Sequence, residues 1–209
     1  MKGDIHIHSK YSPDSHSEPE LIAATARKMG LDYIAIADHN FFKVHELGIL
    51  TIPAEEVSSA DGHILAIFIN TSIPRGLTQE ETIDRIHDAG GIAISAHPFR
   101  LVNGVRSKFI NRYDAIEVKN GRCRVNCNLN ASALAKKFER GITAGSDAHF
   151  PDEVGRTYMQ SDAMDLEGVR KDIVSGNVSV FGKDLSSKEQ MKLYWKYVAD
   201  YFKNGLRRV

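Results

Sequence analysis

The sequence predicts an α/β fold, and three observations support this class. Short apolar runs that favour strands alternate with amphipathic segments along most of the 209 residues, a pattern typical of βαβ crossovers and a mainly parallel sheet. No low-complexity linker or change of composition divides the chain, so residues 1–209 are expected to form a single domain. Polar side chains follow several predicted strands, and in a barrel of parallel strands those ends share one rim, where active sites lie.

The first predicted strand carries an unusual polar pattern. Asp4, His6 and His8 alternate with small or apolar residues, so their side chains share one face of the strand. Two imidazoles and a carboxylate are costly to bury unless something coordinates them. His nitrogens two residues apart on a strand can converge on one cation. We therefore favour a metal-binding strand, with a solvated edge strand as the alternative.

Further strands are expected wherever a short apolar run is bounded by turn residues. They cover residues 33–37, 49–57, 64–68, 92–96, 114–118, 142–145 and 178–181. Several of these runs end in the polar residues that supply the candidate site.

Capping residues and glycines mark the predicted helices. Ser17 and Glu20 form a capping box whose helix ends near Gly30. Thr78 and Glu81 repeat the pattern before a helix that stops at residues 90–91. Additional helices are expected over residues 42–47, 129–139 and 166–174.

The C-terminal segment predicts a helix over residues 186–205, opened by a capping box of Ser186 and Glu189. Its apolar side chains lie along one helical face. They are Met191, Tyr194, Trp195, Val198, Tyr201 and Phe202. We expect this face to pack on the body of the protein or on a partner subunit, giving a homo-oligomer, rather than to stack nucleobases.

Composition restricts the functional class. The 27 Lys and Arg residues balance 27 Asp and Glu, so no global field favours nucleic acid or an anionic membrane. The N-terminal residues favour a strand over a signal peptide, and no apolar run reaches membrane-spanning length. Cys123 and Cys127 have neither zinc-ribbon spacing nor the number expected of a disulfide framework. We expect a cytoplasmic protein with reduced thiols and no membrane partner.

Six histidines and three carboxylates at or near the predicted rim are candidate metal ligands. They are His6, His8, Asp14, His39, Glu56, His63, His97, Asp147 and His149. One zinc ion needs about four ligands, so this set suits two or three divalent ions. Nitrogen and oxygen donors without thiolate favour Mn, Zn or Fe(II) over calcium or copper.

Five motifs in this order resemble those of the PHP (polymerase and histidinol phosphatase) family. They are Asp4-Ile5-His6-Ile7-His8-Ser9, Asp38-His39, Ala54-Glu55-Glu56-Val57, Ala96-His97-Pro98 and Gly145-Ser146-Asp147-Ala148-His149. The resemblance implies a distorted TIM-like (β/α)7 barrel. It also implies a phosphoesterase site with two or three metal ions at the C-terminal rim of the strands.

The resemblance further implies how the ligands divide. One ion would be held by His6, His8, Glu56 and Asp147, a second by Glu56, His63 and His97, and a third by Asp14, His39 and His149. The family has Gly-x-Glu at the shared position, whereas this chain has Ala54-Glu55-Glu56. We prefer Glu56, because strand alternation then points Glu55 away. A turn histidine is the alternative for His63.

Other charged residues are assigned supporting roles. Asp4 and Asp38 are expected to orient imidazoles through their second N–H, with a strand-end cap as the alternative for Asp38. Arg100, Arg156 and Lys119 are expected to bind substrate phosphate, with solvated loop charges as the alternative. Arg122 is a further cation near the rim. Glu117 either faces the rim or forms a salt bridge, and no catalytic acid or base is singled out.

The sequence therefore predicts a metal-dependent phosphoesterase that hydrolyses a small phosphomonoester or nucleotide through a metal-activated hydroxide. A short-oligonucleotide exonuclease or nucleotide bisphosphate phosphatase is the alternative within this chemistry, although zero net charge argues against a long nucleic-acid footprint. A non-catalytic scaffold subunit is the alternative from another class. Such a scaffold need not keep metal ligands, and this chain keeps all nine candidates.

Overall fold

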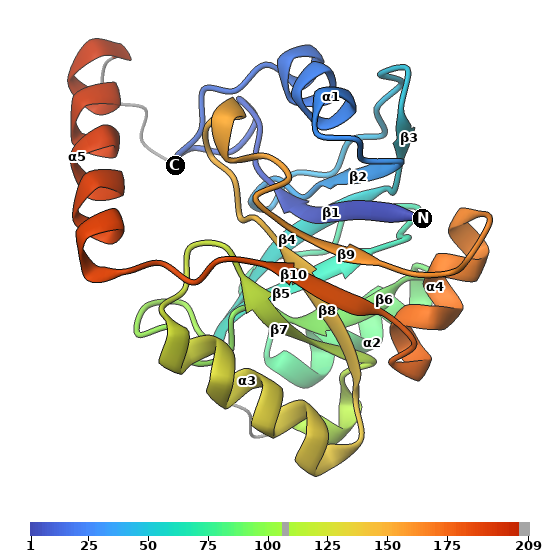
Figure 1. Cartoon of the computed structure of the whole chain (residues 1–209). Helices are drawn as coiled ribbons and strands as arrows, with labels where there is room; N and C mark the ends of the chain where they lie inside the picture. Colours follow the sequence, from blue (N-terminus) through green and yellow to red (C-terminus); the bar gives the residue numbers. More distant parts are fainter. Residues whose placement is uncertain (106–108, 205–209) are drawn as a thin grey trace.

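A computed structural model describes residues 1–105 and 109–204 as a mixed α/β fold (Figure 1). The strands are β1 (Lys2–Ile7), β2 (Tyr33–Ile36), β3 (Leu50–Thr51), β4 (Ala54–Ser59), β5 (Gly62–Ile67), β6 (Ile92–Ser95), β7 (Ala115–Asn120), β8 (Gly141–Gly145), β9 (Thr157–Gln160) and β10 (Ser179–Gly182). The α-helices are α1 (Pro19–Lys28), α2 (Gln79–Asp88), α3 (Val125–Phe138), α4 (Leu166–Ser175) and α5 (Ser187–Asn204). Short 3-10 turns lie at Ile110–Arg112 and Pro151–Glu153.

The strands form two five-stranded sheets. Their orders are β10-β9-β1-β2-β3 and β4-β5-β6-β7-β8. Helices α1, α3 and α4 lie around the outside of the strands, whereas α5 stands to one side (Figure 1). The main hydrophobic core joins the two sheets, since Ile5 of β1 and Met159 of β9 belong to the same buried cluster as Leu65 of β5 and Ile94 of β6.

The expectation of a mainly parallel sheet is only partly correct. The β1–β2, β2–β3, β6–β7 and β7–β8 pairs are parallel, but β4–β5, β5–β6, β1–β9 and β9–β10 are antiparallel. The turn between Ser59 and Gly62 is too short for a crossover, so β5 must return antiparallel to β4.

A closed (β/α)7 barrel is not confirmed. In the described residues no continuous strand pairing links the two sheets, and isolated bridges lie between Ile7 and Ala148 and between His39 and Glu56. Both bridges lie beside candidate metal ligands. The sheets therefore meet at the edge where the polar residues gather.

Two predicted capping boxes are confirmed, those of α2 and α5. Thr78 Oγ1 accepts from the Glu81 N–H at 3.3 Å, and Glu81 Oε2 accepts from the Thr78 N–H at 3.0 Å. Ser186 and Glu189 make the same reciprocal pair at 3.3 and 2.8 Å. The two residues of each box are only three positions apart, so the sequence can predict the pair.

The predicted cap of α1 is wrong. Glu18 is the N-cap and makes no side-chain cap, and Pro19 occupies the first turn. The Ser17 hydroxyl donates instead to the carbonyl of His149 at 3.0 Å. The hydroxyl that would cap the helix is therefore used in a contact with a distant segment. The helix still ends as expected, because Gly30 adopts a φ of 67° directly after the C-cap.

Other differences concern boundaries. Residues 42–47 are not helical, β9 was not expected, and α3 begins at Val125 rather than at residue 129. The single strand predicted over residues 49–57 is split into β3 and β4 around Pro53, which has no N–H to donate to a sheet.

Helix α5 contacts the body through the face opposite its apolar side chains. Lys196 Nζ donates to Asp152 Oδ1 at 2.5 Å, and His16 Nδ1 lies 2.6 Å from Asp200 Oδ2. The apolar face is largely exposed: Trp195 keeps 61% of its surface and Phe202 80%. The apolar face of α5 therefore does not pack on the body of the protein. Its association with a partner subunit stays a prediction. Among the described residues, no helix has the length and apolar character needed to cross a membrane.

Candidate metal centre

Strand β1 presents two buried imidazoles on one face. His6 and His8 are both fully buried, and their Nε2 atoms lie 3.4 and 3.3 Å from Glu56 Oε2 of β4. The same nitrogens lie 3.8 and 3.4 Å from Asp147 Oδ1, which follows β8. Four donor atoms from three segments of the chain thus surround one point.

These four donors fit a divalent ion. Donors about 2.0–2.1 Å from a tetrahedral zinc lie roughly 3.3 Å apart, close to the distances here. Neither His6 Nε2 nor His8 Nε2 has a hydrogen-bond partner, although both atoms are buried. Buried polar atoms without partners are costly, and coordination would satisfy them.

The second carboxylate oxygen of Glu56 faces two more histidines. Glu56 Oε1 lies 3.0 Å from His63 Nδ1 and 3.0 Å from His97 Nε2. His63 comes from β5, paired with β4, and His97 follows β6. Glu56 is therefore positioned to share its two oxygens between neighbouring cations.

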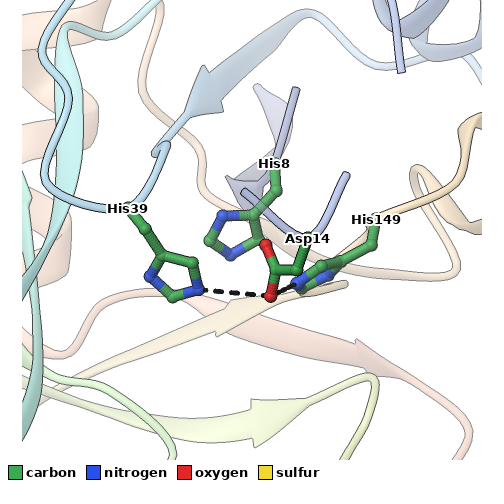
Figure 2. A group of neighbouring side chains, drawn as sticks. All are labelled: His8, Asp14, His39 and His149. Atoms are coloured by element: carbon green, nitrogen blue, oxygen red, sulfur yellow. Dashed lines mark hydrogen bonds and ion pairs between the residues drawn. The ribbon is translucent and has the colours of Figure 1, made fainter. Parts of the chain in front are cut away.

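A further donor group surrounds Asp14. Figure 2 shows the imidazoles of His39 and His149 pointing toward the Asp14 carboxylate, with His8 beside them. Asp14 Oδ2 lies 3.6 Å from His39 Nε2 and 3.0 Å from His149 Nε2. His39 also reaches inward, because its Nδ1 lies 3.1 Å from Glu56 Oε2. The donor groups are thus connected through His8 and His39 rather than separate.

Backbone strain accompanies this geometry. His97 and Asp147 have positive φ values of 29° and 53°, which non-glycine residues adopt at a cost. Gly145 is required for a different reason, since a Cβ there would lie 2.3 Å from the Cβ of His6. Close contact between β8 and β1 brings Asp147 to the histidines.

The imidazoles are oriented by residues other than those predicted. His6 Nδ1 donates to Glu117 Oε1 at 2.8 Å, and His8 Nδ1 lies 2.9 Å from Ser12 Oγ. Fixing one ring nitrogen leaves the other free to coordinate a metal. Of the two roles that the sequence left open for Glu117, the structure shows the one facing the rim. The sequence did not indicate that Ser12 contacts a ligand.

Asp4 and Asp38 contact the backbone and a hydroxyl instead of imidazoles. Asp4 accepts from the N–H groups of Ser146 and Gly155 at 2.9 and 2.8 Å. Asp38 accepts from the N–H and hydroxyl of Ser9, both at 2.6 Å. Their expected role in orienting imidazoles is wrong. These bonds fix the loops that follow β1 and β8, which carry candidate metal ligands.

Glu55 points away from the donor cluster. Its carboxylate accepts from Ser72 Oγ and from the Ile73 N–H, both at 3.1 Å. Alternation along β4 therefore gives Glu55 and Glu56 opposite environments, as expected for a strand.

Burial and neighbouring charges shift the pKa of most donors in the cluster. Burial, with the charge of Arg122, lowers the pKa of His149 to about 4, and burial also lowers the pKa of His97. Burial opposes ionisation of Glu56 and Asp147, but the surrounding imidazoles, joined by Arg100 at Asp147, lower the pKa of both carboxyls well below the usual range. Burial opposes protonation of His6 and His8, but the neighbouring carboxylates raise the pKa of His6 well above its usual range and that of His8 to about 9. Metals bind neutral imidazoles and ionised carboxylates, so a cation at this site must displace protons from His6 and His8.

Of the three predicted phosphate-binding cations, only Arg100 lines the metal cavity. That cavity has a volume of about 210 Å³ and includes Asp14, Glu56 and Asp147 in its wall. Arg100 Nη1 donates to Asp147 Oδ2 at 2.9 Å. Arg156 pairs with Asp152, and both line a second, larger cavity. Lys119 pairs with Asp184 in a third cavity.

Two further residues complete the wall of the metal cavity. Arg122 and Tyr197 both line it, and the guanidinium of Arg122 lies 4.8 Å from the centre of the Tyr197 ring. The ring of Tyr197 also lies 5.6 Å from that of His149. The sequence indicated Arg122, because this residue follows a predicted strand. Nothing in the sequence distinguishes Tyr197 from the other aromatic residues of α5.

Sequence comparison gives matches to relatives and to a family model. The model of the PHP-associated family matches residues 126–178. An uncharacterized protein of Methanocaldococcus jannaschii is 34% identical over 178 residues, which span 80% of this chain and 73% of the relative. A second uncharacterized protein of that organism is 38% identical over 117 residues, spanning 47% of this chain and 68% of the relative.

A solved structure shares the fold. It is a two-domain protein from Bacteroides vulgatus that contains a predicted PHP-like metal-dependent phosphoesterase, and it superposes with a TM-score of 0.71 at 18% identity. The alignment covers 94% of this chain and 69% of that chain. The fold and the donor cluster define an α/β protein built to bind divalent cations. The chain belongs to the PHP family, as its five ordered motifs predicted.

Proposed function

We propose that the protein is a metal-dependent phosphoesterase acting on a small phosphomonoester or nucleotide. The observation that carries the proposal is one cavity that combines the donor cluster with two guanidinium groups, Arg100 and Arg122. A phosphate ester needs this combination, because metals and arginines together neutralise its charged oxygens. The two-domain protein of Bacteroides vulgatus, which contains a predicted PHP-like metal-dependent phosphoesterase and shares the fold, is consistent with this chemistry.

The proposed cofactors are two or three divalent ions, of Mn, Zn or Fe. His6, His8, Glu56 and Asp147 would hold one ion. Glu56, His63 and His97 would hold a second, and Asp14, His39 and His149 a third. The close approach of donor atoms within each group supports this division, and the absence of thiolate donors favours these metals.

When bound, such ions lower the pKa of water and stabilise negative charge at phosphorus. The residues of the chain do the rest. Arg100 is 35% exposed at its side chain and is placed to bind an ester oxygen while it holds Asp147. Glu117 and Ser12 keep the imidazoles of His6 and His8 in a coordinating orientation. Tyr197 narrows the entrance on the side of His149.

The alternatives make different demands on the protein. An exonuclease acting on short oligonucleotides, or a nucleotide bisphosphate phosphatase, would use the same donors with a different substrate. A non-catalytic scaffold would need neither ionised carboxylates nor unpartnered imidazole nitrogens in the interior. The buried His6 and His8 nitrogens therefore favour a metal-binding role over a scaffold.

A cytoplasmic location is part of the proposal. Cys123 is buried and Cys127 is half-buried, and both are free thiols. Free thiols are typical of proteins in reducing compartments.

The test is phosphate release by purified protein loaded with Mn²⁺, Zn²⁺ or Fe²⁺. The panel holds sugar phosphates, mononucleotides, nucleoside bisphosphates, bis(p-nitrophenyl) phosphate and short oligonucleotides. We expect turnover of at least one monoester. Inactivity against the whole panel by protein with a measured metal content would overturn the proposal.

Variants separate the site from the fold. His97→Ala and Asp147→Ala should lose activity and bound metal, because both donors face the buried cluster. His87→Ala is the matched control, since His87 lies on the surface beside Asp114 and outside the donor groups. Equal metal content in His87→Ala and His97→Ala would count against the assignment.

A further inference from the structure

A second, larger cavity lies between α5 and the strands beside the metal centre. Its volume is about 660 Å³, and it is lined by Leu193 and Lys196 of α5, by Thr157 of β9 and by residues following β10. Arg122 lines both this cavity and the metal cavity. We call it the α5 cavity. Arg122 therefore lies between the α5 cavity and the metal cavity.

The sizes of the two cavities suggest a division of roles. Sites for small molecules have volumes of roughly 300–1,000 Å³. The metal cavity, at about 210 Å³, falls below this range, whereas the α5 cavity falls within it. The metal cavity has room for a phosphate group, and the rest of a substrate must lie elsewhere.

Three polar side chains in the wall of the α5 cavity have atoms without partners. They are Arg122 Nε, Glu153 Oε1 and Thr157 Oγ1, and each residue is more than nine-tenths buried. Arg122 Nη2 donates to the other carboxylate oxygen of Glu153, Oε2, at 2.9 Å. One donor, one acceptor and one hydroxyl thus lack partners among the residues that line this cavity. Unsatisfied buried groups are rare and point to a missing partner.

Among the other described residues that line the α5 cavity, seven are charged, two are leucines and none is aromatic. Its cations include Lys183 and Lys192, and its carboxylates include Asp152 and Asp184. A hydroxyl group both donates and accepts, so adjacent hydroxyls suit a wall that mixes donors with acceptors. A nucleobase would find no ring to stack on in this cavity.

We propose that the α5 cavity receives the leaving group of the phosphoester, and that this leaving group is hydroxyl-rich and sugar-like. The proposal rests on the proposed phosphoesterase function and narrows its substrate class. The phosphate occupies the metal cavity with Arg100, and the sugar extends past Arg122 beneath α5. Helix α5 therefore determines specificity.

The experiment compares two classes of substrate in wild type and three variants. The substrates are a panel of hexose and pentose monophosphates and p-nitrophenyl phosphate, whose leaving group has no such hydroxyls. Leu193→Trp places an indole in the α5 cavity. Met191→Trp adds the same group to the exposed face of α5. Thr157→Val removes a hydroxyl from the wall with little change of volume.

Leu193→Trp is expected to lower kcat/KM for the best sugar phosphate by about tenfold or more, with less than a twofold change for p-nitrophenyl phosphate. Thr157→Val should reduce only the sugar phosphate reaction, and Met191→Trp should change neither. The proposal is overturned if Leu193→Trp affects both substrates equally or neither. It is also overturned if mononucleotides are turned over faster than every sugar phosphate.

Failure of the proposed function would be recognised separately. If metal-loaded wild-type protein hydrolyses nothing in the panel, the α5 cavity is tested by calorimetric titration with the same sugar phosphates. Binding by wild type and Met191→Trp, but not by Leu193→Trp, would uphold the cavity as a sugar phosphate site. Absence of binding, or equal binding by all three proteins, would overturn it.

Discussion

Glu117 Oε1 accepts a hydrogen bond from His6 Nδ1 at 2.8 Å, and both side chains are almost completely buried. The second oxygen of Glu117 accepts from the His97 N–H at 2.8 Å and from Asn120 Nδ2 at 3.0 Å. One carboxylate on β7 thus orients a ligand from β1 and the backbone of another after β6. The donor cluster depends on this residue, although it coordinates nothing itself.

Glu117→Gln should therefore weaken metal binding without preventing folding. Replacing the carboxylate by an amide weakens the bond to His6, and changes of this kind cost about 10–100-fold in metal affinity. The measurement is a competitive titration of Zn²⁺ with a chromophoric chelator, with circular dichroism to establish the fold. An unchanged affinity would mean that His6 is held in place by packing alone.

Glu56 and Glu55 provide a comparison between adjacent buried carboxylates. Glu56→Gln should lose most of the bound metal, since both of its oxygens face imidazoles. Glu55→Gln should keep the metal, because its carboxylate binds Ser72 and Ile73. Metal content measured by mass spectrometry after gel filtration decides the matter. The reverse result would place Glu55 at the shared position.

Arg100→Ala should raise KM for a phosphoester. Charged hydrogen bonds are worth about 1.5–3 kcal/mol, which corresponds to a rise of roughly ten- to a hundredfold. Arg112→Ala is the control, because Arg112 pairs with Glu80 and Asp84 far from the cavity. Steady-state kinetics on both variants makes the comparison, and similar KM values would remove Arg100 from substrate binding.

Chelation of the metal should destabilise the protein. A ligand present at a hundred times its Kd stabilises the folded state by about 2.7 kcal/mol, and for a chain of this size its removal lowers Tm by about 5–10 °C. Scanning calorimetry with and without EDTA gives the difference. The Asp147→Ala variant should show a smaller effect of EDTA, because it lacks a donor to one of the proposed ions. An effect as large as that of wild type would mean that Asp147 holds no ion.

The exposed apolar face of α5 predicts self-association. Tyr194, Trp195 and Phe202 are 59%, 61% and 80% exposed, and a contiguous apolar face of this kind favours an interface. Light scattering after gel filtration should give an oligomer for wild type and a smaller species for Trp195→Glu. Lys203→Glu, off the apolar face, should behave as wild type. A monomeric wild type would contradict the prediction.

Local patterns in the sequence determined much of the candidate site. Alternation along β1 puts His6 and His8 on one face, and the same alternation separates Glu55 from Glu56. His97 and Asp147 could be located because strand ends are visible as apolar runs followed by polar residues. Strand alternation and strand ends depend on neighbours within a few positions, so they can be predicted from the sequence.

Only the tertiary structure decided which partner each polar group takes. Asp4 binds Ser146 and Gly155, 142 and 151 residues away, and Ser17 leaves its expected cap for His149, 132 residues away. Tyr197 reaches the metal cavity because of where α5 lies, which its own periodicity does not specify. The sequence specifies the chemistry of each side chain. A hydrogen bond between distant segments forms only where the packing of the whole chain brings them together, and at Ser17 such a bond takes the place of the local cap.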